Sequence, residues 1–204
     1  MSNCCLNTIK IEGPEPDLLS LRDHINAVRR DPLSKRYRNL YLLLLRLGYS
    51  EEEAKNTEMR EDFTGGDAEI RDGVLCLDTE SAWDFQGAGW EMVRSKYSNC
   101  SIYFQAEEFG CDIFCTNDTS GHLFPDKYCL DWGDDETGEC DMEYFHDDCS
   151  LIEYIHDHFD STVGTFEGVK AALKEFSEGD RCDAYANLYE ISYMTEYNLK
   201  AANE

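Results

Sequence analysis

The first 30 residues constrain the fold most, because a strand pattern is followed at once by a helix pattern. Residues 5 to 12 alternate between two faces, which predicts a half-buried strand. One face carries Cys5, Asn7, Ile9 and Ile11. After Gly13 and Pro14, apolar side chains recur three or four residues apart, at Leu18, Leu21, Ile25 and Val28. A strand followed by a helix with one apolar face predicts a sheet that a helix covers.

A leucine-rich stretch next to this opening predicts a helical insertion at about residues 31 to 60. Residues 37 to 47 supply its apolar side chains. Ser50 with Glu53 has the spacing of a capping box, which begins a further short helix. Residues 61 to 73 contain two adjacent glycines and scattered acids, which favours a loop that closes the insertion.

The rest of the chain alternates between strand and helix patterns. Strands are predicted at residues 74 to 77, 101 to 107, 111 to 115 and 123 to 132. Helices are predicted at residues 90 to 97, 149 to 159 and 166 to 176. An acidic turn is expected at residues 134 to 139, and Pro125 favours an edge position for the strand around it. Residues 184 to 197 fit both patterns about equally, with a preference for helix.

This order of elements predicts the α+β class. Its most economical form is a ferredoxin-like antiparallel sheet with helices on one face, a helical insertion and an acidic C-terminal extension. We expect a ferredoxin-like domain at residues 1 to 138, which includes the insertion. Residues 139 to 204 are then an acidic, mostly helical extension packed on the same core.

The negative charge of the chain is concentrated after residue 60. Residues 1 to 60 have a net charge of +1, whereas residues 61 to 204 have a net charge of −26. Between residues 100 and 160, Lys127 is the single Lys or Arg, against seventeen Asp and Glu. Such a field repels nucleic acid, nucleotides and anionic lipid, and attracts cations and basic protein surfaces. A basic protein surface is therefore the partner that charge favours, and direct nucleic-acid binding is not expected.

Composition also favours a cytoplasmic location. The N-terminus lacks the basic and apolar regions of a secretion signal, and the longest strongly apolar run, residues 41 to 45, is far below the roughly 20 residues that span a bilayer. The ten cysteines are then expected to be free thiols. Cys5, Cys76 and Cys129 have apolar neighbours, and we expect them to act as small buried apolar side chains.

Residues 3 to 14, 78 to 83 and 102 to 110 are three segments that, in this order, resemble the Api92-like family, whose members carry a YubB-type ferredoxin-like domain. Residues 3 to 14 resemble its first strand, which ends in Gly-Pro, although Cys4 stands where the family prefers Trp. Residues 78 to 83 resemble its Asp-Thr-Ala-Trp segment with two residues inserted, and residues 102 to 110 resemble its strand rich in Tyr and Glu. The resemblance implies a ferredoxin-like fold and an association with bacterial plasmids, phages and other mobile elements. It implies no activity.

No metal site is expected from the cysteines and histidines, although many fall in one acidic third of the chain. These are Cys111, Cys115, Cys129, Cys140, Cys149, His122, His146, His156 and His158. Structural zinc sites use close pairs of ligands, and this spacing is too loose. Calcium would find many oxygens between residues 134 and 143, but the run lacks the register of an EF-hand loop. We interpret this run as a solvated acidic loop.

No catalytic or cofactor-binding residue is identified. The chain has no Gly-x-Ser-x-Gly, His-Glu-x-x-His, phosphate-binding glycine loop or dinucleotide fingerprint. His156, Asp157 and His158 are adjacent on a predicted helix, so they point to different sides and favour a surface cluster over a catalytic pair. The function best supported is a non-enzymatic binding or accessory protein. An acidic mimic of DNA that inhibits a DNA-acting protein is the alternative, and a metal-binding protein ranks lower.

Overall fold

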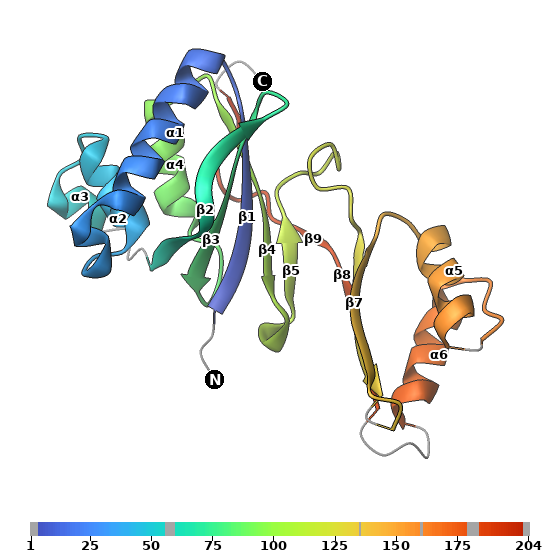
Figure 1. Ribbon diagram of the computed structural model, residues 1–204. Coiled ribbons are helices and arrows are strands. Elements are labelled where there is room, and N and C mark those ends of the chain that lie inside the picture. The colour runs from blue at the N-terminus through green and yellow to red at the C-terminus, as the bar shows by residue number, and fades with distance from the viewer. Residues whose placement is uncertain (1–3, 56–59, 135, 160, 179–183, 202–204) are drawn as a thin grey trace. The chain divides into compact units, whose positions relative to one another are not determined.

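A computed structural model describes residues 4–55, 60–134, 136–159, 161–178 and 184–201 (Figure 1). The chain folds as two compact units. Unit 1 combines Met1–Thr119 with Tyr193–Glu204, and unit 2 is Ser120–Ser192. Each unit has its own sheet, its own helices and its own cluster of buried apolar side chains. The predicted α+β class is confirmed.

The sheet of unit 1 is built around its first strand, β1 (Cys4–Glu12). β1 pairs antiparallel with β3 (Val74–Ala82) on one side and with β4 (Ser101–Glu108) on the other. Three further strands complete the order β2-β3-β1-β4-β5-β9 in the described residues: β2 (Glu61–Arg71), β5 (Ile113–Thr116) and β9 (Ser192–Tyr193). The alternation predicted for residues 5 to 12 is confirmed, because Cys5, Ile9 and Ile11 are completely buried.

Helices cover one face of this sheet (Figure 1). α1 (Glu15–Arg30) buries the four apolar side chains that its sequence spacing singled out. α2 (Asn39–Arg46) and α3 (Glu51–Lys55) form the predicted helical insertion, after a 3-10 turn at Pro32–Lys35. α4 (Gly87–Lys96) packs Trp90 and Val93 into the same core, and a second 3-10 turn, Phe109–Cys111, joins β4 to β5.

The predicted capping box at the start of α3 is confirmed. The backbone N–H and the hydroxyl of Ser50 both donate to the Glu53 carboxylate, at 2.8 and 2.7 Å, and the Glu53 N–H donates to Ser50 Oγ at 3.2 Å. These bonds occupy amide groups that the first turn of a helix cannot satisfy itself.

Unit 2 is a three-stranded antiparallel sheet with two helices on one face. In the described residues its strand order is β7-β6-β8, where β6 is Tyr128–Asp134, β7 is Glu139–Phe145 and β8 is Tyr185–Glu190. The helices are α5 (Asp148–His158) and α6 (Phe166–Glu178), close to their predicted positions. Leu130 and Trp132 of β6 pack against apolar side chains of both helices. This cluster is the core of the unit.

Two sequence-based predictions were wrong about strands. Residues 61 to 73 were expected to be a loop, but most of them form β2, because Phe63 is buried on the helix side and a register shift between Thr64 and Glu69 accommodates the glycines. Residues 184 to 197 were expected to favour helix, but they contain β8 and β9. The backbone pairing of β8 with β6 decides this local ambiguity.

The predicted strand at residues 123 to 132 begins later, at Tyr128, and does not continue the sheet of unit 1. It is β6, the central strand of the other sheet, and Pro125 precedes it. The boundaries between the two units fall after Thr119 and after Ser192, whereas the sequence suggested a boundary after residue 138. The difference arises because the apolar face of β6 packs on α5 and α6.

Candidate protein-docking site

The acidity that distinguishes the sequence is densest in unit 2. Residues 120 to 192 carry 19 Asp and Glu against four Lys and Arg, a net charge of −15. Unit 1, which is nearly twice as long, carries 24 Asp and Glu against 14 Lys and Arg, a net charge of −10. A charged partner would therefore meet the stronger field at unit 2.

The most exposed regular element of unit 2 is the edge strand β7. Its first five residues, 139 to 143, are all exposed. Glu139, Asp141 and Glu143 lie opposite Asp134, Trp132 and Leu130 of β6. Because opposite residues of an antiparallel pair share a face, the three carboxylates project on one side of the sheet. Two residues of strand advance about 6.7 Å, so the carboxylates form a regular row.

The other side of β7 is less polar. It carries Cys140, Met142 and Tyr144, and the side chain of Met142 is 43 % exposed. On the same side, Tyr185 of β8 lies across Gly133, where any Cβ would come within 2.8 Å of the tyrosine ring. β7 therefore presents carboxylates on one face and a thiol, a thioether and a phenol on the other.

A hydrogen-bond chain holds the middle carboxylate of the row. Trp132 Nε1 donates to the Tyr154 hydroxyl at 3.0 Å, and that hydroxyl donates to Asp141 Oδ2 at 3.0 Å. Burial, the bond to Asp141 and nearby negative charge raise the pKa of Tyr154 to about 12. The other Asp141 oxygen accepts the Met142 N–H at 2.9 Å. Asp141 is thus fixed in place, whereas Glu139 and Glu143 extend into solvent.

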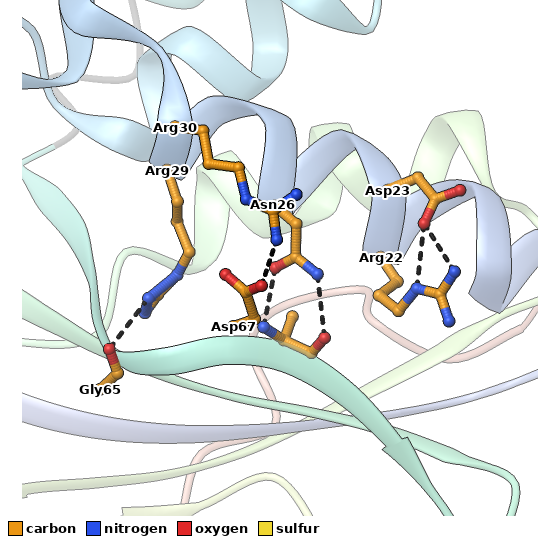
Figure 2. A network of polar contacts seen from close by, with 8 residues as sticks. Arg22, Asp23, Asn26, Arg29, Arg30, Gly65 and Asp67 are labelled. Atoms are coloured by element: carbon orange, nitrogen blue, oxygen red, sulfur yellow. Dashed lines mark hydrogen bonds and ion pairs between the residues drawn. The ribbon is translucent and has the colours of Figure 1, made fainter.

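The corresponding edge of unit 1 is built differently (Figure 2). The register of β2 shifts between Thr64 and Glu69, and α1 holds the irregular segment. The Asn26 amide accepts the Ala68 N–H at 2.8 Å and donates to the Ala68 carbonyl at 3.1 Å. Arg29 donates to the carbonyl oxygens of Thr64 and Gly65. Such bulged and covered edges resist pairing with another strand.

The second edge of unit 2, β8, is partly covered by a helix. The Ala186 N–H donates to Ser177 Oγ of α6 at 2.9 Å, and Lys170 of α6 forms an ion pair with Glu190 at 2.5 Å. β7 keeps its register with β6 without interruption from Asp134–Glu139 to Tyr128–Phe145, and β8 does so from Tyr128–Glu190 to Gly133–Tyr185. Of these three edges, β2 is the irregular one, and β8 differs from β7 in the contacts with α6 that cover it.

The cysteines and histidines weighed as metal ligands do not come together in the described residues. Cys115 and Cys129 are buried, whereas Cys111, Cys140 and Cys149 are exposed. Within the described ranges no three Cys, His, Asp or Glu side chains form a group that could hold a metal. The three histidines of unit 2 beyond His122 have other contacts: His146 faces Asp126 at 2.6 Å, His156 contacts the Val163 carbonyl, and His158 stacks on Tyr154.

The first part of the acidic run after residue 133 forms a hairpin turn, as its sequence predicted. The interpretation of the whole run to residue 143 as a solvated loop was wrong, because residues 139 to 143 pair with β6 as strand β7. Asp134 is buried, and its carboxylate accepts the N–H of Glu136 at 2.9 Å and that of Thr137 at 3.4 Å. Gly138 has a φ of 73°, a left-handed conformation that suits glycine. One carboxylate of the run thus serves to fix the turn. Asp135 lies outside the described residues.

Unit 1 contains a buried carboxyl group that the sequence did not reveal. Glu61 opens β2 and is 0 % exposed. Its Oε1 accepts from the Thr79 hydroxyl at 2.6 Å and from Trp90 Nε1 at 2.9 Å, while Oε2 has no hydrogen-bond partner among the described residues. Burial raises the pKa of Glu61 to about 7 against the lowering effect of these two bonds. Because a loop was expected at residues 61 to 73, a buried side chain at the first of these residues was not predicted.

A cavity of about 410 Å³ lies near the start of α4, but Glu61 does not line it. Arg60, Gln86 and Tyr197 are among its lining residues. So is Trp83, which is 58 % exposed and has a φ of 77°. Positive φ is rare for a bulky residue and marks local strain. These features describe a pocket that has an exposed aromatic ring among its described lining residues.

Comparison with known proteins adds no relative, because no family model, curated protein or solved structure matches the chain. Among the described helices, none has the length and apolar character needed to cross a membrane. The geometry of the molecule itself must therefore support any assignment of function.

Proposed function

We propose that this chain is a non-enzymatic binding or accessory protein that docks a basic protein surface on unit 2. The observation that carries this proposal is the exposed edge strand β7, whose carboxylates Glu139, Asp141 and Glu143 form a row on one face. The net charge of −15 on the unit adds a long-range attraction for cationic surfaces.

The strength of this attraction should depend on salt. Exposed charges are screened beyond a Debye length of about 8 Å at physiological ionic strength, and a larger distance applies in dilute buffer. Because the carboxylates of β7 are exposed, most of their effect should fall on the rate of association and on partner selection.

A pull-down with matched variants tests the proposal. The immobilised full chain is compared with the triple variant Glu139→Gln, Asp141→Asn, Glu143→Gln, at low and at high salt. A control triple, Glu153→Gln, Glu167→Gln, Glu175→Gln, removes the same charge from exposed positions on α5 and α6. We expect basic proteins to be retained at low salt by the native chain and the control, and lost from the β7 variant. Equal retention by all three would contradict docking at β7.

A second candidate function is mimicry of DNA. It is favoured by the even spacing of the β7 carboxylates, which advance about 6.7 Å from one to the next as a regular row of negative charges. Such a row could occupy the basic groove of a DNA-binding protein and inhibit it. Release of the captured partner by added DNA would favour mimicry, whereas simultaneous binding of the partner to DNA and to this chain would favour an accessory role.

The proposal extends to the detailed fold of unit 1 and to the family of the chain. A ferredoxin-like arrangement is supported by the strand order β2-β3-β1-β4, by the antiparallel pairing throughout, and by α1 and α4 as the connecting helices. Membership of the Api92-like family, a bacterial mobile-element setting and a cytoplasmic location remain proposals that rest on the sequence. In such a setting, a basic partner would be a protein that itself handles nucleic acid.

A further inference from the structure

We infer that β7 takes its partner by strand addition, with an extended basic segment of the partner lying antiparallel along the outer edge of β7. This inference rests on the proposed function and adds how the partner binds and what sequence pattern it has. Its lysines or arginines alternate with apolar residues.

The backbone of β7 is suited to strand addition. β7 lies at the end of the strand order, and its seven residues pair with β6 in one unbroken register. The Met142 N–H lies on the outer side of the strand, where it donates to the carboxylate of its neighbour Asp141. An added strand would exchange this local bond for a backbone bond, because backbone groups that point outward from a regular edge can pair with a further strand. The bulged edge β2 does not offer such a run.

The side chains of β7 select the pattern of the added strand. A partner residue opposite Glu139, Asp141 or Glu143 projects on the same face as these carboxylates, and opposite charges on directly opposed residues are favourable. Partner residues between them project on the other face, beside Cys140, Met142 and Tyr144. A basic residue at every second position and an apolar residue between therefore matches both faces of β7.

The same charges exclude a second copy of this chain as the occupant. Two β7 strands side by side would place carboxylate next to carboxylate, which is unfavourable for directly opposed residues. Charged residues on an edge strand are a common means of preventing such self-pairing. The row of acids thus discourages self-association and leaves the edge open to a basic segment.

Synthetic peptides test the inference on the full chain. The probe is a fluorescent octapeptide of alternating lysine and valine, whose binding is followed by anisotropy. Two further peptides carry N-methyl groups on either the valine amides or the lysine amides. In antiparallel addition the valine amides face β7, so their methylation should weaken binding by about tenfold or more, whereas methylation of the lysine amides should not.

Variants of the protein distinguish binding by backbone pairing from binding by charge alone. Met142→Pro removes the outward N–H and leaves every charge in place, and proline is tolerated on edge strands. The variant should bind the unmethylated peptide more weakly, by about as much as methylation of the valine amides weakens binding to the native chain. The triple β7 variant should abolish binding, and the control triple on α5 and α6 should not.

The outcomes are distinguishable. If both methylated peptides and the Met142→Pro variant bind as tightly as their unmodified counterparts, docking by charge stands and strand addition is overturned. If methylation of the lysine amides weakens binding and methylation of the valine amides does not, the added strand runs parallel to β7. That result would overturn the antiparallel orientation. If the unmethylated peptide does not bind the native chain, the inference and the proposed function both fail at this edge.

Discussion

Glu61 is the residue through which pH should act most directly on unit 1. Its pKa is about 7 in the folded chain and near 4.5 when exposed, so the folded state binds its proton more tightly than the unfolded state does. Stability contributed by this group is therefore complete at low pH and is lost as pH rises from 4.5 through 7. One unit of pKa corresponds to 1.36 kcal/mol, so the loss amounts to about 3 kcal/mol.

Glu61→Gln should remove this dependence. The amide oxygen can still accept from Thr79 and Trp90, but the group no longer ionises in the buried site. We expect the variant to gain stability relative to the native chain by about 3 kcal/mol between pH 4.5 and pH 8, as measured by urea unfolding across that range. Glu52→Gln, an exposed substitution on α3, is the matched control. A constant difference between native chain and variant at every pH would contradict the prediction.

Buried thiols provide a second prediction at this scale. Burial raises the pKa of Cys5 to about 12 and that of Cys115 to about 11, and the thiolate is the reactive form. Brief alkylation of the folded chain should therefore label the exposed Cys111, Cys140 and Cys149 well before Cys5 and Cys115. Mass spectrometry of peptides locates the label. Early modification of Cys5 would show that β1 opens more readily than its complete burial implies.

At the scale of elements, the contact between α1 and β2 is the clearest case in which one side chain replaces missing strand pairing. Asn26 satisfies both backbone groups of Ala68 inside the irregular segment of β2 (Figure 2). Asn26→Ala should leave a buried N–H and a carbonyl without partners, at a cost of about 1–3 kcal/mol in the free energy of unfolding. Urea denaturation measures it.

Asn26→Leu distinguishes lost hydrogen bonds from lost packing. It keeps a side chain of similar size and removes both the acceptor for the Ala68 N–H and the donor to the Ala68 carbonyl. Its cost should therefore be close to that of alanine. If leucine keeps the native stability, the bonds to Ala68 do not carry the contact.

Periodicity in the sequence predicted the elements whose buried side chains recur regularly. Residues 5 to 12, the helix around Leu21 and the helices of unit 2 are of this kind. Residues 61 to 73 failed because the strand is irregular there, and its partners for Ala68 come from α1, some 40 residues away in sequence. The row of carboxylates on β7 could not be placed either, since an acidic run predicts no strand.

The arrangement of the residues in the candidate site could also be predicted only in part from the sequence. Charge statistics located the acidity after residue 60, and the structure places its densest part in unit 2. That Glu139, Asp141 and Glu143 share one face depends on the pairing of β7 with β6, which no local pattern in this run encodes. Glu61 depends in the same way on distant partners, Thr79 and Trp90. Residues brought together by long-range pairing are the ones that sequence patterns miss.

At the scale of the whole molecule, the chain leaves unit 1 after Thr119 and returns to it at Tyr193. The returning segment belongs to the core of unit 1. Leu199 is completely buried, and the Ile102 N–H donates to its carbonyl at 2.8 Å. Tyr197 lies edge-on to Phe85, with 6.2 Å between ring centroids. Unit 2 is thus inserted in unit 1 along the sequence, and the C-terminal residues are required to complete the earlier unit.

This arrangement predicts opposite results for two deletions. The Met194 N–H donates to the Thr116 carbonyl at 2.8 Å, so the ends of unit 1 are close and a short Gly-Ser linker can replace residues 120 to 192. That variant should unfold cooperatively in urea, monitored by the fluorescence of Trp83 and Trp90. Deletion of everything after Thr119 should be less stable by several kcal/mol, because loss of a buried leucine alone costs about 2–5 kcal/mol. Equal stability of the two variants would mean that residues 193 to 201 lie on unit 1 without supporting it, and failure of both would make unit 2 part of the cooperative fold.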